Sequence, residues 1–430
     1  MKVALVHELL TMKGGAERVF KILTEMFPDA PIYTLLYDEK KLGDWFPKER
    51  VRTSTLQKFA RFSSNHHFYL PWFPQAVESW SFDPCPSPHP PPSLKLRRTG
   101  NTLPFQPSPR LRPTSKGERE ECFDLVISSS SAFAHGIITN GNPKHLCYVH
   151  SPARYLWDRT HDVMQWSTFA KSSVGKFAPL RWLRKFYLSY IFHKLRIWDA
   201  ESADRPDLLL AASKEVQRRI ELYWRRESTV VYPSIDEDWF NQCHSEPDES
   251  MTLGMSPIRR AQGDMPYFLI VSTLVPYKRI EIAIDACNAL RLPLKIAGDG
   301  PHRKNLERIV GPTIEFLGYK DHKELKNLYA NATATIVPGD EDFGLVPLES
   351  MACGTPVIAY RKGGALETIV EGKTGLLFDG DHPLKNILQS FDPALFNSKT
   401  CRAHAQTFSR VRFEHSIKES IAKLMGIPFL

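Results

Sequence analysis

Short apolar runs alternate with amphipathic stretches over most of this chain. Near the start, an apolar run at 3–6 is followed by a loop with two glycines and an amphipathic stretch at 17–26. From residue 267 the alternation becomes regular and predicts strands at 267–272, 294–297, 314–317, 333–337 and 357–360, with helices at 280–290, 302–309, 322–330 and 346–353. Strands that alternate with helices are typical of a doubly wound parallel sheet.

The same pattern occurs in both halves of the chain, where 32–36 and 125–128 supply further strands of the first half. We therefore predict an α/β fold of two Rossmann-like domains that face each other across a cleft. A length of 430 residues agrees with about two domains. The predicted units are a first domain at 1–235, a polar linker at 236–264, a second domain at 265–410, and a C-terminal helix at 411–430 that is a candidate for crossing back to the first domain.

One segment, residues 83–121, lacks any periodicity and holds 10 of the 33 prolines. Proline at this density removes amide donors and interrupts both helices and sheets. We predict a disordered or loosely packed insertion in the first domain, and a polyproline II docking segment is the alternative.

Composition narrows the class of protein. Apolar residues make up 42% and charged residues 24%, as in soluble globular proteins, and the longest apolar runs are too short to span a membrane. The seven cysteines are scattered without a CxxC pair, which predicts reduced thiols in the cytoplasm and no zinc site. The net charge of +8 favours phosphate-rich partners, but no module that reads nucleic acid is present, so we exclude nucleic acid.

Three consecutive acidic residues, 340–342, follow the predicted strand at 333–337, and Glu349 lies in the next predicted helix. Ligands of open α/β sheets bind at the carboxyl ends of strands. We expect Glu341 and Glu349 to face one crevice, with the backbone amides of 343–345 at the helix N-terminus ready for an anionic oxygen. Such a site suits a sugar attached to a diphosphate, and an acidic helix cap is the plainer alternative.

The string "EDFGLVPLE" followed by "MACGTPV" resembles the E-x7-E signature of retaining GT-B glycosyltransferases (glycosyl transferases group 1). The strings "VHELLTMKGGAERVFKIL", "FDLVISSSSAFAHGI", "CYVHSPARYLWD" and "LVPYKR" are similar to a mannosyltransferase-like branch of surface-polysaccharide biosynthesis. The resemblance implies transfer of a hexose, mannose in this branch, from a GDP- or UDP-sugar to a glycan or lipid-linked glycan acceptor. A catalytically inactive sugar-nucleotide-binding protein and a nucleotide-sugar epimerase of the same fold are the alternatives.

The resemblance implies that the first domain binds the acceptor and the second domain binds the nucleotide-sugar donor. It also implies roles for individual residues. It assigns His150 a place beside the sugar and the acceptor, Glu341 the sugar hydroxyls, and Glu349 the ribose. The remaining donor-binding positions are those near the phosphates, which are Gly14, Gly15, Thr273, Lys278, Phe343, Gly344 and Leu345. No metal or other cofactor is expected on the family pattern, although 340–342 also reads as a DxD metal motif.

Thr273 departs from the family pattern, which usually has an arginine there. An arginine would share the diphosphate with Lys278, and charge-assisted hydrogen bonds are roughly twice as strong as neutral ones. The substitution therefore puts activity, not fold, in question.

A basic stretch at 171–199 carries seven Lys or Arg residues and one acidic residue. Apolar residues recur in it at nearly helical spacing. We predict a contact of 177–199 with an anionic membrane, and a helix packed on the core is the alternative. The expected location is the cytoplasm, at the inner face of the membrane.

Overall fold

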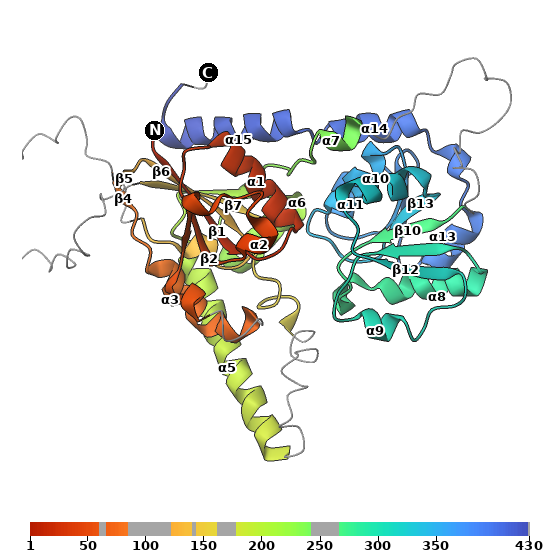
Figure 1. Ribbon diagram of the computed structural model, residues 1–430, viewed down its shortest axis with the longest axis horizontal. Coiled ribbons are helices and arrows are strands. Elements are labelled where there is room, and N and C mark those ends of the chain that lie inside the picture. The colour runs from red at the N-terminus through yellow and green to blue at the C-terminus, as the bar shows by residue number, and fades with distance from the viewer. Residues whose placement is uncertain (60–65, 85–121, 140–142, 161–177, 242–265, 429–430) are drawn as a thin grey trace, which may run out of the picture.

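The computed structural model describes residues 1–59, 66–84, 122–139, 143–160, 178–241 and 266–428. They form two α/β domains that lie side by side, the first drawn in red to yellow-green and the second in green to blue (Figure 1). The predicted α/β fold of two parallel-sheet domains is confirmed. The proline-rich insertion lies outside the described residues, except for its first two residues, 83 and 84.

The first domain is built on a seven-stranded parallel sheet in the order β3-β2-β1-β6-β7-β8-β9. Both faces of its central strands are buried, which explains why they read as continuous apolar runs. The strands are β1 Val3–Leu10, β2 Ile32–Tyr37, β3 Val51–Thr53, β6 Leu125–Ser130, β7 Lys144–Val149, β8 Leu208–Ala211 and β9 Thr229–Val230.

The second domain contains a six-stranded parallel sheet in the order β12-β11-β10-β13-β14-β15. The direction in which successive strands are added to this sheet reverses between β10 and β13. Ligands of such sheets bind at this position. The strands are β10 Phe268–Val271, β11 Leu294–Ala297, β12 Ile314–Gly318, β13 Ala334–Val337, β14 Val357–Tyr360 and β15 Gly375–Phe378. A small two-stranded sheet in the first domain pairs β4 Asp83–Pro84 with β5 Cys122–Phe123.

Helices cover the faces of both sheets. Those of the first half are α1 Gly15–Met26, α2 Glu39–Leu42, α3 Phe73–Glu78, α5 Ala178–Ser202, α6 Lys214–Trp224 and α7 Asp238–Asn241. Those of the second half are α8 Ile280–Leu290, α9 Arg303–Leu306, α10 His322–Asn331, α11 Leu345–Ala352, α12 Ala365–Thr368, α13 Leu384–Ser390, α14 Ser398–Gln406 and α15 Arg410–Met425. Short 3₁₀ turns occupy η1 Lys48–Arg50, η2 Thr55–Lys58, η4 His66–Trp72, η5 Ala134–Gly136, η8 Pro276–Lys278 and η9 Pro393–Leu395.

Three details differ from the sequence predictions. The helix expected at 302–309 covers only Arg303–Leu306, because Leu306 alone of these four residues is buried and too little apolar surface supports a longer helix. Part of the predicted linker forms α7, whose Trp239 is 1% exposed and packs in the second domain's core. Cys122 is disulfide-bonded, so the expectation of reduced thiols throughout is wrong there.

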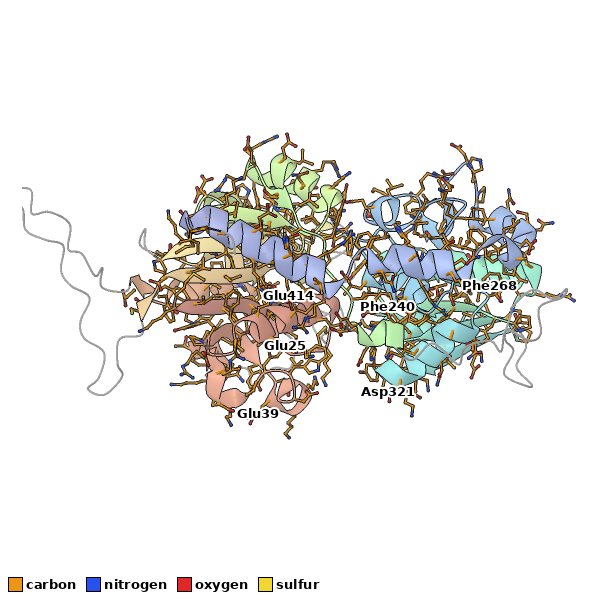
Figure 2. All side chains as sticks on the ribbon, turned by 90° about the horizontal axis from the view of Figure 1, so that it is seen from above. Glu25, Glu39, Phe240, Phe268, Asp321 and Glu414 are labelled. Carbon is orange, nitrogen blue, oxygen red and sulfur yellow. The ribbon has the colours of Figure 1, made fainter. Side chains whose placement is uncertain are left out.

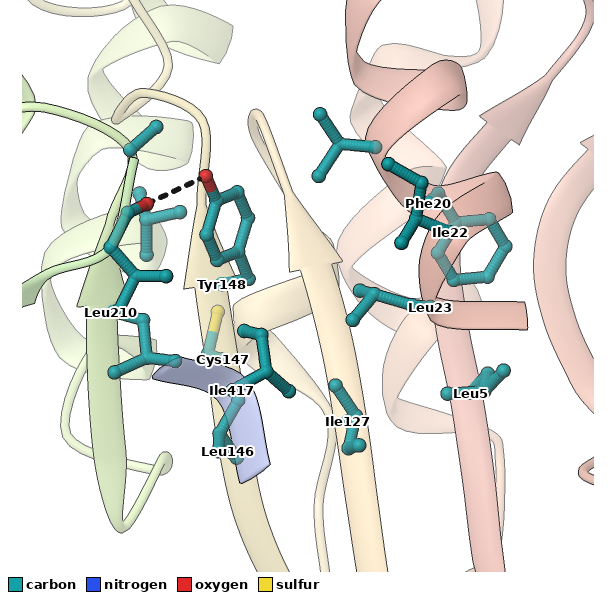
Figure 3. Packing of buried hydrophobic residues seen from close by; sticks show 14 of the residues in the cluster. Leu5, Phe20, Ile22, Leu23, Ile127, Leu146, Cys147, Tyr148, Leu210 and Ile417 are labelled. Atoms are coloured by element: carbon teal, nitrogen blue, oxygen red, sulfur yellow. Dashed lines mark hydrogen bonds between the residues drawn. The ribbon is translucent and has the colours of Figure 1, made fainter. Parts of the chain in front are cut away.

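The chain's last described helix, α15, returns to the first domain. Phe413 and Ile417 are buried in the core cluster of the seven-stranded sheet, and the Phe413 ring lies 5.6 Å from the ring of Tyr148. Figure 3 shows Ile417 among Leu146, Cys147 and Tyr148, with the Tyr148 hydroxyl donating to the Val231 carbonyl at 2.9 Å. The first domain is therefore completed by residues from the opposite end of the chain.

The start of α15 is also held by charge. The Arg410 guanidinium donates to Glu25 of α1 at 2.5 Å and to Glu414 at 2.6 Å. Figure 2 shows Glu25 and Glu414 near each other, with α15 lying along the first domain and α14 over the second. Within the described parts of the chain, no helix combines the length and the apolar character that crossing a membrane requires.

Ile417→Ala tests the contribution of α15 to the first domain. The side chain is fully buried, so we expect the free energy of unfolding to fall by about 2–5 kcal/mol. Urea unfolding followed by circular dichroism measures the change. Val411→Ala on the same helix, where the side chain is 66% exposed, is the matched control. Equal unfolding midpoints for the two variants would contradict the packing of α15.

Candidate functional site

A cleft of about 1590 Å³ separates the two domains and is lined by residues from both. All ten residues that the sequence predicted for catalysis or donor binding line this cleft. They are Gly14, Gly15 and His150 of the first domain, and Thr273, Lys278, Glu341, Phe343, Gly344, Leu345 and Glu349 of the second. The structure thus brings the predicted set together, while the role of each residue stays a prediction.

The acidic loop connects β13 to α11. Gly344 precedes the helix with a φ of +89°, a conformation that favours glycine, so α11 begins at Leu345. The segment before it runs alongside Gly363, which pairs with Glu341 as a parallel bridge. A Cβ on Gly364 would lie 2.2 Å from the Phe343 carbonyl oxygen, so this loop requires a glycine beside it. This glycine pair was not predicted from the sequence, although two adjacent glycines after β14 are a visible signal there.

Glu341 is paired with Lys278. The Lys278 ammonium donates to both carboxylate oxygens at 2.6 Å. Burial alone would lower the pKa of Lys278, but the Glu341 carboxylate raises it overall, so the lysine is charged. The cation predicted for the diphosphate and the acid predicted for the sugar therefore lie side by side.

Glu349 is buried, with 3% of its surface exposed. One carboxylate oxygen accepts from the Arg18 guanidinium of α1 and the other from the Tyr329 hydroxyl at 3.0 Å. The Glu349 charge raises the pKa of Arg18. Glu349 thus borders the cleft, as expected, but its carboxylate is enclosed by these two partners. Arg18 belongs to the "GGAERV" string, and a pairing over 331 residues left no signal in the sequence that would have singled it out.

The aspartates on either side of Glu341 face the first domain. Arg154 contacts an oxygen of Asp340 and one of Asp342, each at 3.1 Å, and Arg219 also pairs with Asp342. Burial raises the pKa of Asp342, while the pKa of Asp340 is lowered overall by Arg154 and other cations despite its burial. The interpretation of 340–342 as a DxD metal-binding motif does not fit, because arginine side chains pair with both aspartates. Among the described residues, no cluster of three or more His, Cys, Asp or Glu could hold a metal ion.

His150 follows β7 and is fixed by a hydrogen-bonded chain. Its Nε2 atom lies 2.8 Å from the Ser129 hydroxyl, which lies 3.1 Å from Nδ1 of the buried His7. Exclusion of water and the neighbouring His7 lower the pKa of His150 to about 3. The imidazole is therefore neutral near pH 7, able to exchange hydrogen bonds with sugar hydroxyls but not to act as a cation.

The glycine loop of the first domain faces the acidic loop of the second. Gly14 caps α1, Gly15 begins it, and a Cβ on Gly15 would lie 3.5 Å from the Leu345 side chain. Thr273 is exposed in the cleft wall just after β10. The amino ends of α1 and α11 therefore meet at the cleft, and such ends favour anionic groups.

Comparisons with known proteins agree with this architecture. Residues 255–404 match the family model described as Glycosyl transferases group 1. The GDP-mannose-dependent alpha-(1-6)-phosphatidylinositol monomannoside mannosyltransferase of Mycolicibacterium smegmatis is 34% identical over 170 residues, which cover 34% of this chain and 42% of that protein. The D-inositol 3-phosphate glycosyltransferase of Acidothermus cellulolyticus is 35% identical over 265 residues, which cover 52% of this chain and 58% of that protein.

Among solved structures, the HepE protein of Anabaena in complex with UDP superimposes with a TM-score of 0.61 at 17% identity, covering 98% of this chain and 100% of that one. The structure thus has the GT-B fold of two parallel-sheet domains. Within it, the chain carries a glycosyl transferases group 1 domain. The chain spans about half the length of the curated relatives it matches.

The depressed pKa of His150 predicts how the site responds to pH. Because the folded-state pKa of about 3 lies below the ordinary value of 6.5, the imidazole should not titrate between about pH 5 and pH 8. The unfolded chain takes up this proton first, so the contribution to stability is present above pH 6.5 and is lost as the pH falls towards 3. Nuclear magnetic resonance of histidine-labelled protein, with His150→Gln to identify the signal, measures this. A midpoint near the ordinary value would contradict the neutral state of this half-buried histidine.

Proposed function

We propose that this protein is a retaining hexosyltransferase. It moves a hexose, with mannose as the favoured candidate, from a GDP- or UDP-sugar to a glycan or lipid-linked glycan. The observation that carries the proposal is the meeting of Glu341, Lys278 and Glu349 with the glycine loop in one interdomain cleft. The mannosyltransferase from M. smegmatis supports a GDP-mannose donor, and a HepE structure with bound UDP-glucose keeps UDP-hexoses among the candidates.

The donor would lie with its diphosphate between Lys278 and the amide groups of Gly15 and Leu345. Helix N-termini and an ammonium group both stabilise negative charge that develops on a departing nucleoside diphosphate. Glu349 would accept hydrogen bonds from the ribose, and Glu341 from the sugar. These roles use only charges and donors that already line the cleft, and they need no metal.

Retention of configuration would follow a front-face route. Both oxygens of Glu341 are engaged by Lys278, so this carboxylate suits orientation of hydroxyls better than attack on the anomeric carbon. The departing phosphate then takes the proton of the acceptor hydroxyl, while neutral His150 aligns sugar and acceptor. Positioning of the two substrates and stabilisation of the developing negative charge would together account for the rate enhancement.

Helix α5 supports an acceptor at a membrane. In Figure 1 it projects away from the body of the first domain. Its described side chains include exposed Phe186, Tyr187 and Tyr190, at 65%, 55% and 52%, near the exposed Lys194. Phe192 and Leu195 on the same helix are buried, so its carboxyl half also packs on the core, as the alternative interpretation proposed. We propose that the exposed part touches anionic lipid at the cytoplasmic face.

A vesicle experiment tests this contact. Phe186→Ser combined with Tyr190→Ser should reduce co-sedimentation with phosphatidylglycerol-rich vesicles, because fewer aromatic rings reach the lipid interface. The matched control is Tyr319→Ser, which removes a 73% exposed ring from the second domain. Equal sedimentation of the three proteins would rule out α5 as the contact.

An assay of the purified whole chain distinguishes the candidate functions. GDP- and UDP-hexoses are incubated with short glycan acceptors, and both nucleotide release and a lengthened glycan are measured. A transferase yields both products, an inactive binding protein yields neither, and an epimerase alters the donor sugar without a glycan product. Failure to form any lengthened glycan with all donors tested would contradict the proposed function.

Glu341→Gln tests the acid at the reaction centre. Removing the charge leaves the half-buried Lys278 ammonium without its partner and weakens the interaction with the sugar. We therefore expect transfer to fall by at least ~10-fold. The matched control is Glu315→Gln, the same change at an exposed position of β12. Glu349→Gln should lower both donor affinity and thermal stability, because its carboxylate is buried against Arg18. Wild-type transfer rates in Glu341→Gln would contradict the assignment.

Thr273→Arg tests the departure from the family pattern. A guanidinium in the cleft wall would add a charged donor near the leaving group, so turnover should rise by ~10-fold if it reaches the phosphate. Lys278→Ala should lower turnover, since it removes the existing cation. Unchanged turnover and unchanged donor affinity in a folded Thr273→Arg variant would show that this loop does not approach the diphosphate.

A further inference from the structure

The side chains of the three acidic residues at 340–342 contact groups of both domains. Glu341 forms an isolated parallel bridge with Gly363, and the chain bends directly after it. Glu341 meets Lys278 of its own domain. Asp340 and Asp342 meet arginines of the first domain.

Two arginines of the first domain connect the aspartates on either side of Glu341. Arg154 donates to the Asp340 carboxylate and carbonyl at 3.1 and 3.0 Å, and it lies 3.1 Å from Asp342. Arg219, whose side chain is 2% exposed, pairs with Asp342 and is held by Glu215 at 2.9 Å. A planar guanidinium that bridges two carboxylates fixes their geometry in a way that a lysine does not.

Other groups of the first domain hold the same loop. Arg159 donates to the Asp340 carbonyl at 3.0 Å and stacks on Tyr277, which precedes Lys278, at 4.2 Å. The Ser213 hydroxyl donates to the Asp342 carbonyl at 2.6 Å. The first domain therefore anchors the loop around Glu341 through its backbone as well as its side chains, and Lys362 of the second domain adds an ion pair with Asp340 at 3.3 Å.

A contact beside this loop also joins the two domains. The Glu367 carboxylate of the second domain accepts the backbone N–H groups of Lys214 and Glu215, at 2.8 and 3.1 Å, where α6 begins. A carboxylate at a helix N-terminus is stabilised by the helix dipole. It adds a second attachment of α6 to the second domain beside Arg219.

The end of the loop, at Phe343, contacts the two segments in which the chain passes from one domain to the other. Phe343 stacks on Tyr232 at 5.7 Å and lies 5.7 Å from the Phe408 ring. Tyr232 belongs to the outgoing crossing and Phe408 to the returning one, and Ile235 pairs with Ser409 as a bridge between them. A change in the angle between the domains would therefore act on both ends of the 340–343 segment.

We propose that Arg154, Arg159 and Arg219 are positioning residues that hold Glu341 in its donor-binding geometry only while the two domains are closed. The first domain, which is expected to bind the acceptor, would then control donor binding in the second. The effect on donor affinity rests on the proposed function, whereas the effect on domain closure does not.

Arg154→Met removes the bridging cation with little loss of volume. Arg154→Lys keeps the charge but cannot bridge both aspartates. Small-angle X-ray scattering of the whole chain measures domain separation without any donor, and calorimetric titration with UDP and with GDP measures nucleotide affinity. The affinity readout uses GDP-mannose and UDP-glucose beside the free nucleotides, because Glu341 is assigned to the sugar. We expect both variants to show a larger radius of gyration and ~10-fold weaker binding of the sugar nucleotides, with a larger effect in Arg154→Met than in Arg154→Lys.

Arg361→Met is the matched control, because Arg361 pairs with Glu371 and Asp379 inside the second domain. Its scattering and nucleotide affinity should match those of the wild type. Wild-type scattering in Arg154→Met, or wider separation with unchanged nucleotide affinity, would overturn the proposal. So would weaker binding without any change in separation, because the arginines would then be ordinary donor contacts. If the wild type binds neither nucleotide, the proposed function fails and the scattering comparison alone decides the closure claim.

Discussion

The arrangement of this protein depends on the acidic segment 340–342, whose carboxylates pair with groups of both domains. Its middle carboxylate pairs with Lys278 of the second domain, and its outer two pair with arginines of the first domain. Because the three residues are consecutive in the chain, neither role can shift without disturbing the other. The cleft wall and the attachment between the domains are therefore parts of the same short stretch of chain.

Two ion pairs line the cleft before any ligand enters. Lys278 is paired with Glu341, and Arg18 is paired with Glu349. A partly buried charge without a partner is costly, so these pairs keep the empty site folded. A sugar nucleotide offers replacements for both partners, since its diphosphate attracts the cations and its hydroxyl groups donate to the carboxylates. Binding would then exchange one set of interactions for another without leaving a charge unpaired.

Much of the fold was readable from the sequence because parallel strands buried on both faces are continuous apolar runs. The strand that leads into the acidic loop lies where such a run predicted it. The glycine loop and the E-x7-E string also predicted residues that the structure brings to one cleft. What the sequence did not reveal are pairings between distant positions, such as Arg18 with Glu349 and Arg154 with Asp340. Each joins residues of different domains, so no local spacing marks it. The short α9 was also missed, because the length of that helix depends on tertiary packing. The scattered cysteines gave no sign of the disulfide at Cys122.

We propose above that the cleft holds a nucleoside diphosphate sugar through Lys278, Glu341 and Glu349. A crystal structure of the whole chain grown with GDP or UDP is the decisive measurement. We expect the diphosphate beside Lys278 and the Gly15 amide, with the ribose hydroxyls donating to Glu349 and Arg18 displaced from that carboxylate. A nucleotide bound outside the cleft, or bound there with Glu349 still enclosed by Arg18 and no contact to Lys278, would contradict it.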